Sequence, residues 1–465
     1  MTKPEVAVVG AGPAGMAAAL ALDSAGAAVT LVDEQPAAGG QIYRAVDHVA
    51  ERHPQNLAVL GEDYAAGGKM TAGLRESGVR MVRDASVWDI AGGESPRLGL
   101  VDRDGASMMN PDHIVLATGA MERPMPFPGW TLPGVMGVGA AQTLLKASGL
   151  IPDCRVVVAG SGPLVYLFIR QMLAAGGRPA ALLDTAPARP PAHLWAQLVH
   201  AAFADPSALR KGRAWLGEIR EVGIPHQHRI RQFRALGGER IEAVEYEDAG
   251  QRKQRIACDL LLVHDGVIPN THLAMAADCT HAWNPIQQYW RPAVDPLGFS
   301  SVNRISICGD QAGILGADAA ERGGRVTGLG VANRLNLIDG DELKRVTAED
   351  QARLRKLSVL RRFLDAFYLP LAFCQVPPDD DTIVCRCEQV SAGELRTVAS
   401  HGCMGPNQGK AFTRCGMGPC MGRYCGNTVS QILASHHGKP VESIGHYRIR
   451  PPVRPISVGD LASMG

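Results

Sequence analysis

Cysteines near the end of the chain have the types and the spacing of a metal site. Cys385 and Cys387 form a C-x-C pair, and Cys420 and Cys425 form a C-x4-C pair after 32 intervening residues. Four thiolates in two close pairs can hold a 2Fe–2S cluster. Zinc is the competing occupant, because four cysteines also build closed tetrahedral zinc sites.

The other cysteines are interpreted separately. Cys415 is a spare candidate ligand, because it precedes Cys420 with the same C-x4-C spacing, and Cys403 is read as structural. An odd total of 11 cysteines indicates a reducing compartment and a metal site rather than a disulfide framework. Five thiols are expected to be buried and inert: Cys154, Cys258, Cys279, Cys308 and Cys374.

The start of the chain carries a glycine-rich loop of the nucleotide-binding kind. Gly10, Gly12 and Gly15 form a G-x-G-x-x-G motif between an expected strand at 5–9 and an expected helix at 15–26. The first glycine permits a tight turn, and the second lets the backbone approach a pyrophosphate at the helix N-terminus. Asp33 closes the next expected strand, at 28–32, where an acid binds ribose hydroxyls.

Two later motifs favour FAD over NAD at this loop. Ala117 to Gly119 resembles the A-T-G motif of flavoproteins with two dinucleotide-binding domains, and the run ending in Asp310 resembles their late G-D motif. A flavin would also give a cluster its electrons, so iron–sulfur is favoured over zinc. The candidate cofactor-binding residues are Gly10, Gly12, Pro13, Ala14, Gly15, Asp33, Glu34, Gly40, Gln41, Thr118, Gly119 and Asp310.

A second strand–loop–helix–strand pattern follows at 155–183 and indicates an internal duplication. Gly160 and Gly162 begin a second fingerprint, and Asp184 closes its next strand. Val165 replaces the third glycine, where a branched side chain would crowd a pyrophosphate or hold the helix away from the strand. This loop therefore fits either a bound nucleotide or a vestige kept for packing.

The predicted fold class is α/β. Two Rossmann-like dinucleotide-binding domains of the glutathione/thioredoxin-reductase type precede a small helical 2Fe–2S domain. The first domain is expected to be discontinuous, at 1–125 and 286–340, around a second at 126–285. A helical linker at 341–379 leads to the cluster domain at 380–438 and an extended tail at 439–465. Ser391 and Glu394 predict a capping box and a helix after the C-x-C pair. The cysteine arrangement resembles bacterioferritin-associated ferredoxin.

Three runs together resemble one family over nearly the whole chain: Gly39 to Arg44, Thr413 to Cys420, and Arg450 to Ile456. The family is the alpha subunit of heteromeric flavin-dependent amine and amino-acid dehydrogenases. It includes the opine oxidase A subunit, the hydrogen cyanide synthase B subunit and the D-hydroxyproline dehydrogenase alpha subunit. The resemblance implies a beta subunit similar to D-amino-acid or sarcosine oxidases, which binds the substrate. A small gamma subunit is a further candidate partner. FMN at a subunit interface, and ATP in place of FAD, occur in some relatives.

Composition and polar patterning narrow the function further. A net charge of +1 argues against a nucleic-acid surface. The apolar run at 6–22 is broken by glycines, so no transmembrane segment is expected. A cytoplasmic protein follows, with peripheral contact at the inner face of the membrane left open. No catalytic set is visible, and His264, His272 and His281 are read as ordinary residues.

The sequence thus predicts an oxidoreductase subunit that carries FAD and a 2Fe–2S cluster and transfers electrons. It would serve a dehydrogenase of amino acids, imino acids or opine-type secondary amines, and would be inactive without its partner. The alternative is a self-contained NAD(P)H-dependent flavin reductase that passes electrons out through its cluster. A third reading is a docking subunit with the cluster as a structural element.

Overall fold

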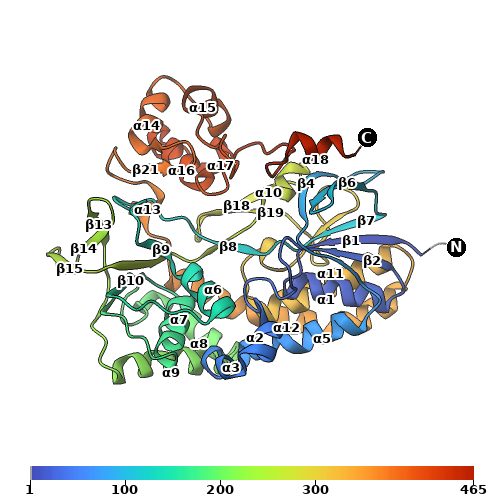
Figure 1. Ribbon diagram of the computed structural model, residues 1–465, viewed down its shortest axis with the longest axis horizontal. Helices are drawn as coiled ribbons and strands as arrows, with labels where there is room; N and C mark the ends of the chain where they lie inside the picture. Colours follow the sequence, from blue (N-terminus) through green and yellow to red (C-terminus); the bar gives the residue numbers. More distant parts are fainter. Residues whose placement is uncertain (1–2, 465) are drawn as a thin grey trace.

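The computed structural model describes residues 3–464 and contains a five-stranded parallel sheet built from distant parts of the chain (Figure 1). Its strands are mostly apolar, with His113 and Ser306 as buried polar exceptions, as expected for a sheet covered on both faces. The last strand returns to this sheet after the whole second unit, as the sequence predicts. The order is β20 (Ile305–Ile307), β7 (His113–Leu116), β1 (Glu5–Val9), β2 (Ala28–Val32) and β3 (Arg80–Val82).

Helices cover one face of this sheet. Helix α1 (Pro13–Ser24) follows β1 and packs against α11 (Ala317–Arg334). A Cβ on Gly324 would lie 2.0 Å from the Ala14 carbonyl oxygen, so this glycine permits the close approach of the two helices. The other face is covered by an antiparallel sheet of β4 (Ser86–Ala91), β5 (Arg97–Asp102) and β6 (Gly105–Met109).

A second parallel sheet repeats the pattern, which confirms the predicted second Rossmann-like unit. Its loop enters α7 (Pro163–Ala174), and α6 (Val138–Ser148) and α9 (Pro206–Glu221) pack on α7. An antiparallel sheet, β13 to β15 (Gln232–Gly237, Ile241–Glu247, Lys253–Ala257), lies beside it. The strand order is β12 (His226–Gln227), β11 (Ala181–Asp184), β10 (Val156–Gly160), β16 (Leu260–His264) and β9 (Val135–Gly137).

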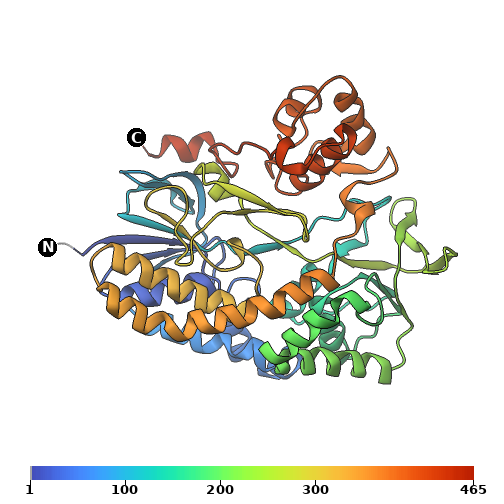
Figure 2. The same cartoon turned by 180° about the vertical axis from the view of Figure 1, so that it is seen from behind.

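Two further elements join the units. Strands β8 (Ala120–Glu122) and β17 (Val267–Pro269) cross between them as an antiparallel pair. Helix α12 (Gly340–Phe367) has 28 residues, a length of about 42 Å. Figure 2 shows it running along the underside of the molecule, where it packs on α11 and on α8 (Trp195–Ala204).

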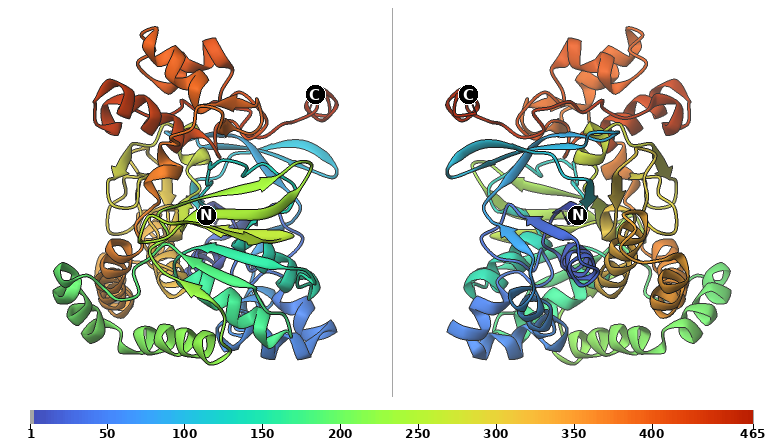
Figure 3. Two further views of the ribbon diagram at one scale, coloured as in Figure 1. Left: turned by 90° about the vertical axis from the view of Figure 1, so that its left-hand side faces the viewer. Right: turned by 90° about the vertical axis from the view of Figure 1, so that its right-hand side faces the viewer.

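The cysteine-rich region forms a small lobe on the opposite side of the molecule (Figure 3). A hairpin of β21 (Ile383–Cys385) and β22 (Val390–Ser391) leads into α14 (Ala392–Ser400), α15 (Pro406–Thr413) and α16 (Gly426–His437). The predicted capping box is present, because the Ser391 Oγ accepts from the Glu394 N–H at 3.3 Å and a Glu394 carboxylate oxygen accepts from the Ser391 N–H at 2.8 Å. The core of the lobe is shared with the main body, because Met275 and Trp290 belong to the same apolar cluster as Val429 and Leu433.

Helices α4 (Glu62–Ala65) and α5 (Gly67–Glu76) precede β3. The expected form of the tail needs correction. The tail does pack back, with the Val453 N–H donating to the Trp88 carbonyl at 2.8 Å, but it ends in α18 (Val458–Ala462) rather than in an extended arm. Within residues 3–464, no helix is both long enough and apolar enough to cross a membrane.

Candidate functional site

The first glycine loop has the backbone geometry that its motif predicts. Gly10 has a φ of +104°, and a Cβ there would lie 2.4 Å from the Ala117 carbonyl oxygen. Gly15 packs still closer, because its Cβ would lie 1.7 Å from the Gly10 oxygen. Gly12 is the N-cap of α1 and has no cap from a side chain. The loop therefore presents backbone N–H groups at a helix N-terminus, which is the usual form of a phosphate site.

Asp33 is held rigidly beside this loop. One carboxylate oxygen accepts from the Ala11 N–H, and the other accepts from the Gln35 N–H at 2.7 Å. Burial raises the pKa of Asp33, while these two backbone donors lower it. Its neighbour Glu34 contacts Arg454 of the tail, so the C-terminal segment borders the same loop.

A single cavity of about 810 Å³ collects the predicted cofactor residues. This volume is within the range of small-molecule and cofactor sites. Each of the twelve candidates except Gly15 lines the cavity, and Gly15 packs behind the loop. Thr118 is fixed by its N–H donating to Gln311 Oε1 at 2.9 Å, and Asp310 accepts from the Leu315 and Gly316 N–H groups at 2.9 and 3.0 Å.

The second glycine loop opens onto the same cavity through Ser161, Gly162 and Pro163. Val165 does not crowd it, because this side chain is wholly buried in the core. What differs from a nucleotide site is Asp184, which is 1% exposed and accepts from the Tyr166 hydroxyl at 2.8 Å. The acid expected to bind ribose is therefore turned into the protein.

The four predicted metal ligands lie in two spatial pairs. Cys385 and Cys425 are buried with their sulfurs within 4.8 Å, and Cys387 lies beside Cys420 nearer the surface. Each spatial pair takes one cysteine from the C-x-C motif and one from the C-x4-C motif. A 2Fe–2S cluster needs two thiolates for each iron, so this donor set fits it.

Cys415 is a neighbour of the buried pair. Its Sγ lies 4.0 Å from the Cys425 Sγ, and within the same 4.8 Å group as Cys385. Hydrogen bonds from Cys415 and then Cys425 lower the pKa of Cys385 to about 2, which favours a thiolate there. The Tyr447 hydroxyl donates to the Cys415 carbonyl at 3.0 Å and fixes the loop. Contrary to expectation, Cys154 is exposed rather than buried.

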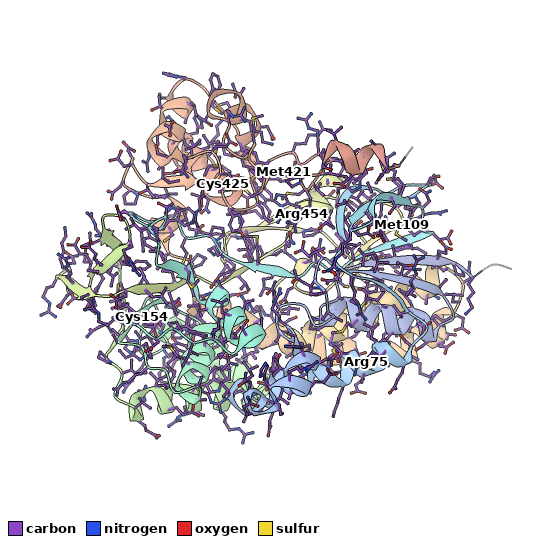
Figure 4. All side chains as sticks on the ribbon, in the orientation of Figure 1. Arg75, Met109, Cys154, Met421, Cys425 and Arg454 are labelled. Atoms are coloured by element: carbon purple, nitrogen blue, oxygen red, sulfur yellow. The ribbon has the colours of Figure 1, made fainter. Side chains whose placement is uncertain are left out.

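The cavity reaches the cysteine lobe. Arg423 and Tyr424, which directly precede Cys425, line it together with Arg454. Figure 4 places Cys425, Met421 and Arg454 where the lobe meets the rest of the molecule. His272 joins the two parts as well, through a hydrogen bond of 3.1 Å to the Met421 carbonyl.

One polar pair escaped the sequence interpretation. His264 is 3% exposed, and its Nδ1 lies 2.7 Å from Glu122 Oε1, with both residues lining the cavity. The signal available in the sequence was weak. His264 ends a buried strand, and carboxyl ends of parallel strands face ligand crevices. Glu122 lies on a connecting strand that no motif marks.

These features define an oxidoreductase of the two-domain flavoprotein class with a cysteine-rich extension. Residues 4–180 match the family of pyridine nucleotide-disulphide oxidoreductases. Residues 381–464 match the sarcosine oxidase A3 domain.

The chain belongs to the family of the opine oxidase A subunit. It is 39% identical to that subunit of the Agrobacterium tumefaciens (strain Ach5) enzyme, over 99% of this chain and 92% of that protein. It is 30% identical to the hydrogen cyanide synthase subunit HcnB of Pseudomonas aeruginosa, over 98% of each chain. The predicted family is thereby confirmed.

Solved structures share the fold. L-proline dehydrogenase from P. horikoshii has a TM-score of 0.72 at 19% identity, over 99% of this chain and 79% of that chain. T. acidophilum thioredoxin reductase has a TM-score of 0.52 at 16% identity, over 72% of this chain and 100% of that chain. Such low identities support the architecture alone.

Proposed function

We propose that this chain is the electron-transfer subunit of a heteromeric dehydrogenase. The substrate would be an amino acid, an imino acid or an opine-type secondary amine, oxidised in a separate beta subunit. FAD would bind along the first glycine loop, with ATP as the alternative occupant. A 2Fe–2S cluster would bind to Cys385, Cys387, Cys420 and Cys425.

The observation that carries this proposal is the single cavity between the glycine loop and the cysteine lobe. Gly10 and Gly12 line one part of it, and Arg423 and Tyr424 line another. A cofactor in this cavity would therefore lie beside the loop that carries Cys420 and Cys425. When bound, a flavin accepts electrons in pairs and an iron–sulfur cluster accepts them singly, so the two are suited to act in sequence.

The residues of this chain have separate tasks in that arrangement. The backbone of the glycine loop would bind a pyrophosphate, and Asp33 would orient a ribose while the Ala11 and Gln35 N–H groups hold it. The capped helix α14 and Tyr447 would keep the cysteine loops in place. Arg423 would contribute positive charge between the two sites, near Cys420.

A partner chain is part of the proposal. One curated relative is named as the A subunit of opine oxidase, and another as the HcnB subunit of hydrogen cyanide synthase. We infer that a beta subunit, similar to D-amino-acid or sarcosine oxidases, supplies the substrate site, with FMN as a candidate group at the interface. A reducing, cytoplasmic location is part of the same proposal, because the thiols would have to stay free to bind the cluster.

Single substitutions test the metal site. Cys→Ala at 385, 387, 420 or 425 is expected to remove the visible absorbance and most of the iron and acid-labile sulfide. Cys415→Ala is expected to keep them, and Cys154→Ala on the surface is the control. If Cys415→Ala bleaches the protein and Cys425→Ala does not, the proposed ligand set is wrong, and Cys415 takes the place of Cys425.

The nucleotide is tested separately. Denaturing the purified protein and separating the released nucleotides by chromatography is expected to yield FAD. Recovery of ATP or ADP alone would contradict the proposal that FAD binds here. It would not contradict the fold.

A further inference from the structure

The edge of the second parallel sheet carries a cluster of ligating side chains that the proposed electron transfer does not use. Strand β11 pairs with the edge strand β12 in parallel, with Leu182 opposite His226 and Leu183 opposite Gln227. Continuing this register places Asp184 opposite His228. Because side chains alternate along a strand, His226 and His228 lie on the same face, and so does Asp184.

We propose that Asp184, His226 and His228 bind one divalent transition-metal ion of the zinc type. The three ligand atoms lie within 4.8 Å of one another. His226 Nε2 is 2.9 Å and His228 Nδ1 is 3.7 Å from the same carboxylate oxygen, Asp184 Oδ2. Ligand atoms about 2.1 Å from a tetrahedral ion are about 3.4 Å apart, so small shifts would complete the geometry.

The carboxylate is already oriented by other groups. Asp184 Oδ1 accepts from the Ala186 N–H at 2.9 Å, and Oδ2 accepts from the Tyr166 hydroxyl at 2.8 Å. Outer hydrogen bonds of this kind fix metal ligands and set their direction. Asp184 is buried, so its position does not depend on solvent.

The imidazoles show why a hydrogen-bonded network alone does not account for the cluster. His228 Nδ1 is buried and has no hydrogen-bond partner within residues 3–464. An ion between the three groups would use this nitrogen, whereas the carboxylate already has Ala186, Tyr166 and His226 as hydrogen-bond partners.

The donor set selects the kind of ion. Two imidazoles and one carboxylate suit zinc and its neighbours in the first transition row, whereas magnesium and calcium prefer oxygen ligands. Three protein ligands leave a position for water, and His228 is the most exposed of the three side chains at 30%. Arg220 adds a nearby positive charge that would repel a metal ion. The negative charge of the Asp184 carboxylate is therefore needed to offset it.

Occupancy would have a consequence for the second glycine loop. Asp184 ends β11 at the position where a Rossmann-like unit binds ribose. An ion held there would engage this acid and would join the edge strand β12 to β11. The second unit would then carry a metal site in place of a nucleotide ribose site.

The test is zinc binding by the full chain, purified with its cluster and treated with a chelator before zinc is added back. We expect about one equivalent of zinc per chain by mass spectrometry. His228→Ala is expected to lose this zinc or to bind it at least about tenfold more weakly, because even outer-partner losses cost about tenfold. His200→Ala, exposed on α8, is the matched control.

Two further measurements keep the outcome interpretable. Iron content must stay unchanged in His228→Ala, which separates this site from the cysteine lobe. Zinc is expected to raise the melting temperature of the parent protein and not that of His228→Ala, and His228→Cys is expected to restore binding. The proposal is overturned if the parent protein binds no zinc after chelation, or if His228→Ala binds it as tightly as the parent.

Discussion

Two glycines of the first loop differ in what a side chain would meet. At Gly12 a Cβ would touch only the Gly40 Cα, at an ordinary 3.8 Å, and φ is −77°. Gly12→Ala should therefore fold, at a cost of about 1 kcal/mol at the N-cap, yet occupy the space of a pyrophosphate. We expect the affinity for the nucleotide to fall at least about tenfold, or about 1.4 kcal/mol, and the nucleotide released per chain to fall with it.

The matched variants separate binding from folding. Gly68→Ala meets nothing within 4 Å and should keep both nucleotide and stability. Gly10→Ala should fail to fold, because its Cβ would overlap the Ala117 carbonyl at a positive φ. Full nucleotide content in folded Gly12→Ala would show that no phosphate approaches this loop.

His113 makes stability depend on pH. The side chain is wholly buried on β7, bonds Ser306 Oγ at 2.9 Å, and has a pKa lowered to about 3, chiefly by burial. The unfolded chain binds a proton near pH 6.5 and the folded chain does not. The contribution of His113 to the free energy of unfolding is therefore fully present above about pH 6.5. It is lost progressively as pH falls toward 3.

His113→Asn should reduce this slope by up to about 1.4 kcal/mol per pH unit, the effect of one proton. Urea midpoints measured between about pH 7 and pH 5 would show it. His200→Asn, exposed on α8, should keep the parent slope. An unchanged slope in His113→Asn would mean that His113 is already protonated in the folded protein.

At the scale of elements, Arg123 holds the junction of the two units. It follows β8, donates to the backbone carbonyls of Asp265, Gln287 and Gln288, and lies 3.7 Å from the Asp265 carboxylate. Both side chains are 2% exposed. Removing one partner of a buried ion pair leaves the other uncompensated, which costs about 3–5 kcal/mol.

Arg123→Met should accordingly lower the free energy of unfolding by about that amount. Adding Asp265→Leu should recover part of it, because the stranded carboxylate disappears. Arg155→Met, in an exposed pair with Asp259, should change little. Urea unfolding provides the comparison, and a loss in Arg123→Met no larger than that in Arg155→Met would contradict this assignment.

Elements with a strong local signal were predictable from the sequence. Strands β1, β2 and β10 are buried apolar runs beside glycine loops, and α14 begins at a capping box. Long-range arrangements were not predictable. Cys385 meets Cys415 and Cys425 only in the folded chain, and spacing along the sequence does not encode that contact. Cys154 was misplaced for the same reason, since apolar neighbours in sequence do not bury a loop residue.

The candidate site divides in a similar way. Candidate cofactor-binding positions such as Gly12 and Asp310 are marked by motifs, because binding the cofactor requires a glycine or an acid at a fixed place. His264 and Glu122 come from strands far apart in the chain and meet only in the fold. The role of Tyr166 in turning Asp184 inward depends on the angle between α7 and β11, and no local pattern reports that angle.

At the scale of the whole molecule, one cavity is shared by three parts. The two glycine loops open onto it from the two parallel sheets, and the cysteine lobe closes it with Arg423 and Tyr424. The helix α12 and the β8–β17 crossing hold the sheets in place. Such an arrangement suits a cofactor that receives electrons at one end and releases them at the other.

The chain alone is expected to show no dehydrogenase activity. Its second loop has Asp184 sequestered by Tyr166, which weakens a nicotinamide route. The cavity is expected to hold the cofactor, so the amine substrate should bind in the partner subunit. Electrons should therefore enter this chain from a flavin of the partner. Expressing this chain without a second polypeptide and assaying dye reduction with amino acids, imino acids, opine-type amines or NADH should give background rates. Co-expression with the beta subunit should restore the amine-dependent rate, and a Cys425→Ala complex, with its cluster lost, should interrupt it.

Turnover by the isolated chain would relocate the catalytic site. The His264–Glu122 pair would then be the first candidate, because a histidine and a carboxylate in hydrogen-bond contact line the cavity there. His264→Asn would abolish such activity if that pair transfers the proton. In contrast, His264→Asn in the two-subunit enzyme should retain most of the amine-dependent rate, because the proton leaves the substrate in the partner. These opposite expectations for one variant distinguish an electron-transfer subunit from a self-contained reductase.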